Sequence, residues 1–145
     1  MPAFRFRLDQ VLKYRTQLED QARVELARVE RERLREQERA DVIRALLEEQ
    51  EAKLAKIDLG NQGERWLLEN YIKGQRNDLS ITLMRVRNWN MAAEAARTEL
   101  LKRSKDKKIL EKLKAKQAES HVQEEKFREQ QELDETATLR YKIPA

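Results

Sequence analysis

The sequence has no cysteine, one histidine and only three glycines among its 145 residues, and its two prolines, Pro2 and Pro144, lie at the ends. Without cysteine the chain can form neither disulfides nor thiolate metal sites, which agrees with a reducing compartment. No apolar run approaches the roughly 20 residues that span a membrane, and the N-terminus lacks a signal-peptide core. We therefore expect a cytosolic protein without direct membrane insertion, attached to other structures only through its partners.

Charged residues are what the sequence has in excess. They form 40% of the chain, against about a quarter in typical domains. Most of the remainder is Ala, Leu and Gln, which with Glu, Lys and Arg are strong helix formers. Such a composition predicts long helices that share a narrow seam rather than a compact core. The formal net charge of +4, from 31 basic and 27 acidic residues, is a small surplus of mixed signs and only weakly indicates nucleic-acid binding.

Apolar or small residues recur in alternating steps of four and three, with polar interruptions, as is typical of a left-handed coiled coil. The first run contains Leu8, Leu12, Arg15, Glu19, Ala22, Leu26, Val29, Arg33, Glu36, Ala40, Ile43, Leu47, Gln50, Leu54 and Ile57. The second contains Leu68, Ile72, Gln75, Leu79, Thr82, Val86, Trp89, Ala93, Ala96, Leu100, Leu110 and Leu113, and then thins to Val122, Phe127, Leu133, Ala137 and Tyr141. The two runs predict helices over about residues 4–58 and 64–142.

Two of the three glycines, Gly60 and Gly63, interrupt this pattern with Asn61 between them. The GNQG segment has neither the phosphate-loop signature nor a preceding strand, so it is not a phosphate loop. A bend over about residues 59–63 predicts an all-α fold, a single antiparallel coiled-coil hairpin over residues 1–145 that is monomeric on its own. The alternatives are one continuous helix in a parallel dimer and a generic structural coiled coil that acts as a homodimer or as an adaptor.

Counted from Leu8 to Asp58, the first helix should be about 75 Å long, against about 118 Å for the second. The hairpin then places Leu8 opposite the region around Lys114. About the last 25 residues of the second helix extend past the first, unless the N-terminus covers them. The basic run KRSKDKK, residues 102–108, comes near Glu19 and Asp20, so we expect much of its charge to be neutralised within the hairpin.

The sequence offers little for catalysis. His121 could form a weak metal site with Glu124 and Glu125, although a solvated helix residue is the simpler interpretation. Carboxylate pairs on an open helix lack the buried pocket that shifts a pKa for acid–base work. We predict no enzyme activity, no cofactor and no metal. The basic stretch over residues 102–116 contains acidic residues and no aromatics, so it favours a charged coiled-coil face over nucleic-acid binding.

Trp66, Leu67 and Tyr71 follow the bend directly. Trp and Tyr are favoured anchors in protein interfaces, so an exposed cluster here could bind a partner. The alternative is that these side chains pack on Leu54 and Ile57 and lock the turn.

Four segments, in this order, resemble the flagellar export protein FliJ family over essentially the whole chain. They are FRFRLDQVLKYRTQLE (residues 4–19), the bend followed by RWLLENYI (65–72), KILEKLK (108–114) and QQELDETA (130–137). The resemblance implies a non-enzymatic antiparallel two-helix coiled coil, similar to the central stalk of rotary ATP synthases. It implies a place at the flagellar basal body, on the cytoplasmic face of the inner membrane.

The family's partners, carried onto this chain, are the flagellar export ATPase hexamer, the transmembrane export gate protein and the export chaperones. The resemblance implies that the protein inserts in the ATPase ring and promotes its assembly. The residues that would face the ring are Phe4, Phe6, Leu8, Leu133, Asp134, Glu135 and Ala137. Trp66, Leu67 and Tyr71 would face the gate or the chaperones.

Overall fold

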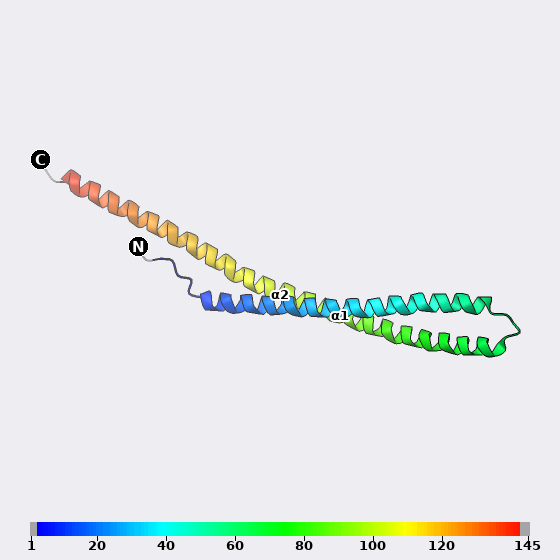
Figure 1. The fold of residues 1–145 in the computed structure, drawn as a ribbon. Coiled ribbons are helices and arrows are strands. Elements are labelled where there is room, and N and C mark those ends of the chain that lie inside the picture. Colours follow the sequence, from blue (N-terminus) through cyan, green and yellow to red (C-terminus); the bar gives the residue numbers. More distant parts are fainter. Residues whose placement is uncertain (1–2, 143–145) are drawn as a thin grey trace. The chain divides into compact units, whose positions relative to one another are not determined.

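The computed structural model describes residues 3–142, which form two helices and no strand (Figure 1). Helix α1 spans Asp9–Lys56 and helix α2 spans Gln62–Lys142. With 81 residues against 48, α2 is the longer helix. The predicted all-α antiparallel hairpin with a longer second helix is confirmed.

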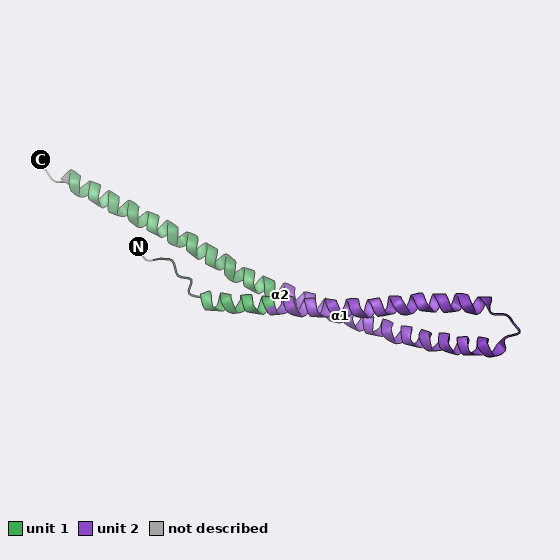
Figure 2. Cartoon of the chain, in the orientation of Figure 1, with its two compact units in different colours: residues 1–20, 102–145 green, residues 21–101 purple. Residues whose placement is uncertain are grey.

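The chain divides into two units (Figure 2). Unit 1 contains residues 1–20 and 102–145, and unit 2 contains residues 21–101. Each unit therefore holds one stretch of α1 and one of α2.

Ion pairs between the helices show that their direction is antiparallel within each unit. In unit 1, Lys114 Nζ lies 3.2 Å from Asp9 Oδ1, and Arg15 Nη1 lies 3.0 Å from Asp106 Oδ2. The residue number of the partner on α2 falls as the residue number on α1 rises. The two helices of this seam therefore run in opposite directions. Unit 2 repeats the pattern with two pairs, Glu30 with Arg97 and Glu51 with Arg76.

The core of unit 2 is a single seam between the two helices. Its buried apolar residues all occupy positions of the predicted stripes: Val29, Ala40, Leu47, Ile72, Val86 and Ala93. No large side chain in the described part of the chain is fully buried. Two helices cannot enclose a seam residue on every side, so stability comes from many half-buried contacts along the stripe.

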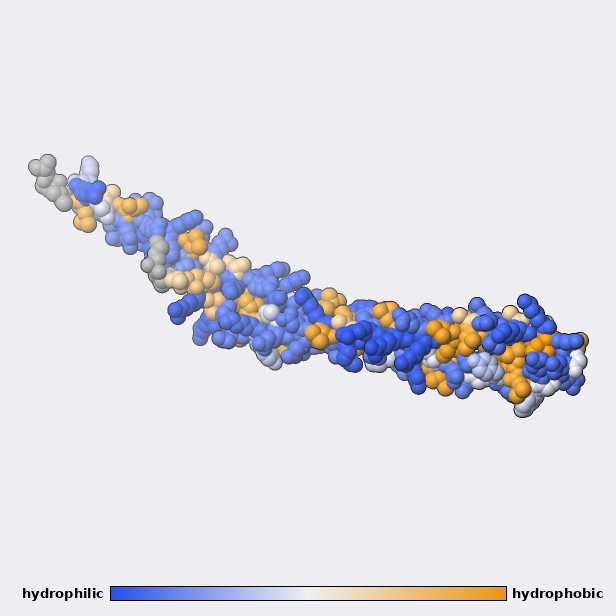
Figure 3. Space-filling model, viewed as in Figure 1, coloured by the Kyte–Doolittle hydropathy of each residue, from blue (hydrophilic) through white to orange (hydrophobic). Residues whose placement is uncertain are grey.

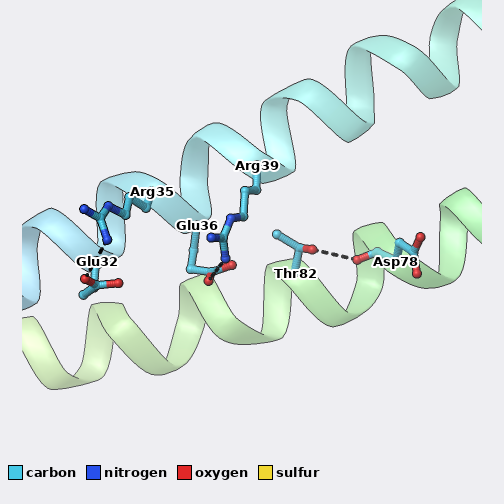
Figure 4. Close-up of polar contacts among 6 residues, drawn as sticks. All are labelled: Glu32, Arg35, Glu36, Arg39, Asp78 and Thr82. Carbon is cyan, nitrogen blue, oxygen red and sulfur yellow. Dashed lines mark hydrogen bonds and ion pairs between the residues drawn. The ribbon is translucent and has the colours of Figure 1, made fainter.

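Two buried positions of this seam are polar (Figure 4). Glu36 is only 7% exposed and Thr82 6%, and Figure 4 shows Glu36 directed from α1 toward α2. Arg39 Nη1 donates to Glu36 Oε1 at 2.7 Å, while Oε2 has no partner within the described residues. Thr82 donates to the Asp78 carbonyl at 2.8 Å, within its own helix. A buried carboxylate with one unsatisfied oxygen makes the seam weaker at Glu36 than an apolar side chain would.

The bend does not depend on the backbone freedom of glycine. No glycine has a positive φ, and a Cβ at Gly60 or Gly63 would meet no atom within 4 Å. Asn61 directly precedes α2: its carbonyl accepts from the Arg65 N–H at 3.1 Å, and its side-chain amide donates to Glu64 Oε2 at 2.5 Å. Glu64 also places negative charge in the first turn of α2, where the helix dipole favours it.

The N-terminal residues correct the predicted start of the first helix. The helix begins at Asp9 rather than near residue 4, and residues 3–8 are not helical. Residues 7 and 8 form a turn, and the Asp9 N–H donates to the Phe6 carbonyl at 3.1 Å just before the helix. The ring of Phe4 lies beside His121, with centroids 5.7 Å apart.

The N-terminal segment therefore covers part of the predicted extension of α2. Ala118, His121 and Glu125 are half-buried, and every residue from Lys126 to Tyr141 is exposed. We call residues 126–141 the C-terminal segment. It is shorter than the 25 or so residues expected, because the N-terminal segment covers α2 as far as His121 through Phe4.

Gly74 lies inside α2, is exposed, and has free space where a Cβ would stand. Gly74→Ala is expected to raise the free energy of unfolding by about 0.4–1 kcal/mol, because alanine loses less backbone entropy in a helix. Urea unfolding followed by circular dichroism measures this. The reverse change at another exposed position of α2, Ala95→Gly, should lower stability by a similar amount, and a loss of stability in Gly74→Ala would contradict the expectation.

Candidate functional site

The predicted ring-facing residues do not form one cluster. Phe4 lies opposite His121, and Leu133 is twelve residues further along α2, about 18 Å away along the helix. Phe6 is buried, Phe4 is half-buried and Leu8 is 37% exposed. The other four predicted residues, Leu133, Asp134, Glu135 and Ala137, are all exposed on the C-terminal segment. Unit 1 thus separates the set into an N-terminal part that covers α2 and an open C-terminal part.

His121 is half-buried rather than fully solvated, and the planes of its ring and that of Phe4 meet at 44°. Within residues 3–142, no three His, Cys, Asp or Glu side chains form a group that could hold a metal ion. The visible role of His121 is to pack against the N-terminal segment.

The C-terminal segment is held by bonds within its own helix. Thr136 and Thr138 donate to the carbonyls of Glu132 and Asp134, both at 2.8 Å. Its large apolar side chains project into solvent, with exposed fractions from 63% to 93%: Phe127, Leu133, Leu139 and Tyr141. The sequence-based site omitted Leu139, although an apolar residue in a strongly charged tail is a usable signal.

At the bend end of unit 2, Trp66 and Leu67 are each 64% exposed and Tyr71 is 45% exposed. Of the two interpretations, exposure describes Trp66 best, since its side chain is not covered by the turn. Leu67 and Tyr71 share an open groove with Ile57, so they also line the turn. The hydrophobic side chains visible in Figure 3 gather most densely at this end of unit 2.

The groove has a volume of about 710 Å³ and an apolar floor with charged edges. Its lining consists of Gln50, Lys53, Lys56, Ile57, Glu64, Leu67, Leu68 and Tyr71. Lys53 and Lys56 stand in the last turn of α1, where cations complement the helix dipole. These two lysines and Leu59, which is 80% exposed in the bend, were not among the predicted site residues. In the sequence, the feature that could have indicated the two lysines is their spacing of three residues at the end of a predicted helix.

Charged residues along the seam form ion pairs between the two helices. Lys107 Nζ lies 3.4 Å from the buried Glu19 Oε1, and Asp106 pairs with Arg15. Of the basic run 102–108, Lys107 thus meets Glu19 as expected, whereas Asp106 of the same run pairs with a cation of α1. The hydrogen bond from Lys114 lowers the pKa of Asp9, and the one from Arg33 lowers the pKa of Glu30, with Arg97 adding to it. Both carboxylates take part in ion pairs between and along the helices.

Neither helix carries, within residues 3–142, a stretch both long and apolar enough to cross a membrane. A protein-family model described as Flagellar FliJ protein matches residues 4–143 of the chain. Comparisons with curated proteins and with solved structures give no match.

The lowered pKa of Glu30 makes the stability of the fold depend on pH. Because its pKa is lowered from 4.5 in the folded chain, its stabilising contribution is complete above the unfolded value and is lost as pH falls through the folded one. Melting temperatures measured by circular dichroism should therefore drop between about pH 5 and pH 3. Glu30→Gln should melt lower at about pH 7 and show a smaller drop than the unsubstituted chain.

Glu48 supplies a matched control, since it is exposed on the same helix and has no ion pair among the described residues. Glu48→Gln should leave both the melting temperature and its pH dependence nearly unchanged. Equal effects of the two substitutions would contradict a specific role for Glu30.

Proposed function

Because the chain belongs to the flagellar FliJ family, whose members are components of the flagellar export apparatus, we propose that it acts there as a non-catalytic stalk. It binds within the ring of the export ATPase and promotes assembly and turnover of that ring. Through its bend end it contacts the transmembrane export gate and the export chaperones. This places the protein on the cytoplasmic face of the inner membrane at the flagellar basal body.

The observation that supports ring binding is the distribution of apolar side chains on the C-terminal segment. Phe127, Leu133 and Leu139 are exposed and follow one another at intervals of six residues. At about 100° per residue, six residues correspond to about 240°, so the three side chains point in three directions about 120° apart. A helix that docks on one surface would gather its apolar residues on one face. A helix enclosed by several subunits needs them on all sides.

Two further features support the same role. All residues from Lys126 to Tyr141 are open to a partner, since no part of unit 1 covers them. The N-terminal segment closes the seam just before this point, through Phe4 and His121. In this proposal Phe4, Phe6 and Leu8 hold the end of the stalk in order, while Leu133, Asp134, Glu135 and Ala137 make the contact with the ring.

The decisive experiment mixes the purified chain with the cognate export ATPase and measures hexamer formation and ATP turnover. The full chain should stimulate both, and deletion of residues 126–145 should abolish the stimulation. Leu133→Glu should raise the concentration of the chain that is required for stimulation about tenfold or more, as expected for an interface anchor.

Leu101→Glu is the matched control: Leu101 is also on α2, and its exposure of 61% is close to the 66% of Leu133. It should stimulate the ATPase like the unsubstituted chain. Absence of stimulation by the full chain would refute ring binding. Equal loss in the two variants would show that a charge on α2, not the C-terminal segment, is responsible.

The bend end is tested separately. Trp66→Ala removes the largest exposed side chain near the bend and should weaken binding of the gate's cytoplasmic domain or of the export chaperones about tenfold. ATPase stimulation should not change, because the C-terminal segment remains intact. Biolayer interferometry measures the first quantity and the turnover assay the second. Unaltered binding of every one of these partners would remove Trp66 from the docking surface.

A further inference from the structure

The outer face of α2 in unit 2 carries a second stripe with coiled-coil spacing. Its seven members are all exposed and all uncharged: Asn77, Ile81, Met84, Asn88, Met91, Ala95 and Thr98. We call these residues the outer stripe. They follow one another in steps of four and three. Four residues in ten of this chain are charged, so seven solvent-facing positions without a charge are unusual for it.

The outer stripe points away from the seam. Met84 stands two residues from buried Thr82 and two from buried Val86, and two residues correspond to about 200° of a helix. Met84 and Met91 are 63% and 65% exposed. The hairpin itself therefore does not use these side chains.

The outer face of α1 in the same unit is different. Its exposed positions at similar spacing are Val24, Ala27, Arg31, Leu34, Glu38, Val42, Ala45 and Glu49. Three of these are charged, as is typical of a solvated helix face. The lack of charge is therefore a property of the outer face of α2 and not of both helices.

The spacing identifies the kind of partner. A stripe with steps of four and three stays in contact only with another α-helix that runs alongside it, because the stripe follows the slow supercoil of two helices. From Asn77 to Thr98 it extends about 32 Å, or about six turns. Methionines in such a stripe adapt their shape to different packing partners.

Charges at its edges identify the chemistry of that partner. Arg85 and Arg87 lie on opposite sides of the stripe at the level of Met84 and Asn88. Both are exposed, and neither has an ion pair within the described part of the chain. Glu94 stands one heptad after Arg87, on the same side of the stripe. A partner helix with carboxylates on both edges near its middle would complete these pairs.

We propose that the outer stripe binds an amphipathic α-helix of an export partner, with an uncharged face and a carboxylate on each edge near its middle. This rests on the proposed function and extends its bend-end surface. Trp66 and Asn70 precede the stripe at the same spacing, with Lys73 between them and Asn77. The partner helix thus lies along α2 from the bend end as far as Thr98.

The test uses the full chain and, as probes, the purified cognate export chaperones and the cytoplasmic domain of the export gate, one at a time. Met84→Lys/Met91→Lys should weaken binding of the stripe's partner about tenfold or more, and Arg85→Glu/Arg87→Glu should weaken it by repulsion. Val24→Lys/Val42→Lys is the matched control. These valines are 69% and 67% exposed on the outer face of α1, and the control should bind like the unsubstituted chain.

Four outcomes would overturn the proposal. The first is normal binding by Met84→Lys/Met91→Lys, which would leave the proposed function intact. The second is loss of ATPase stimulation in this variant, which would assign the stripe to the ring. The third is self-association of the unsubstituted chain in sedimentation that this variant abolishes, which would make a second copy the occupant. If no probe binds the unsubstituted chain while the ATPase is still stimulated, the bend-end part of the proposed function fails and the inference falls with it.

Discussion

Two helices can shield only one stripe of each other from water, and this constraint governs the protein. A seam of this kind buries small and medium side chains such as Val29, Ala40 and Ala93 well. It leaves larger residues half open, so stability accumulates along the length of the seam rather than in one core. Each heptad therefore matters a little and none dominates. The faces that the seam does not use stay free to carry other contacts.

Charges in the seam decide how the helices pair. In a parallel dimer with its helices in register, Arg15, Glu19 and Glu36 would each face its own copy, and buried like charges are costly. In the antiparallel hairpin Arg15 meets Asp106 and Glu19 meets Lys107. The same residues that lower the stability of the seam thus favour one direction of pairing. Glu36 is the exception, because Arg39 of its own helix satisfies only one of its oxygens.

The periodicity of the sequence predicted the two helices, the bend and nearly every seam residue. In a coiled coil, the spacing of apolar residues determines which of them are buried. The periodicity could not predict residues 3–8, which precede the helix and are not helical, with Phe4 covering part of α2. The contact of Phe4 with His121 depends on tertiary packing that no local pattern encodes. For the site, the resemblance assigned one group of residues to the ring and another, at the bend, to the gate or the chaperones. The structure divides the ring-facing group into an N-terminal part and a C-terminal part that lie apart on α2. Lys53, Lys56 and Leu139 were missed, since single residues outside a stripe carry no periodic signal.

The C-terminal segment has a thermodynamic character of its own. Its bonds are local, from Gln130 to Asp134 and from Thr136 and Thr138 to carbonyls one turn back. A helix of this length without tertiary support is governed by a helix–coil equilibrium, in which warming shortens it from its free end. Substitutions in the seam will therefore leave its helicity almost unchanged, whereas temperature and N- or C-terminal charge will alter it. A partner that grips this segment supplies the ordering that the hairpin does not, and its affinity will carry the temperature dependence of that equilibrium.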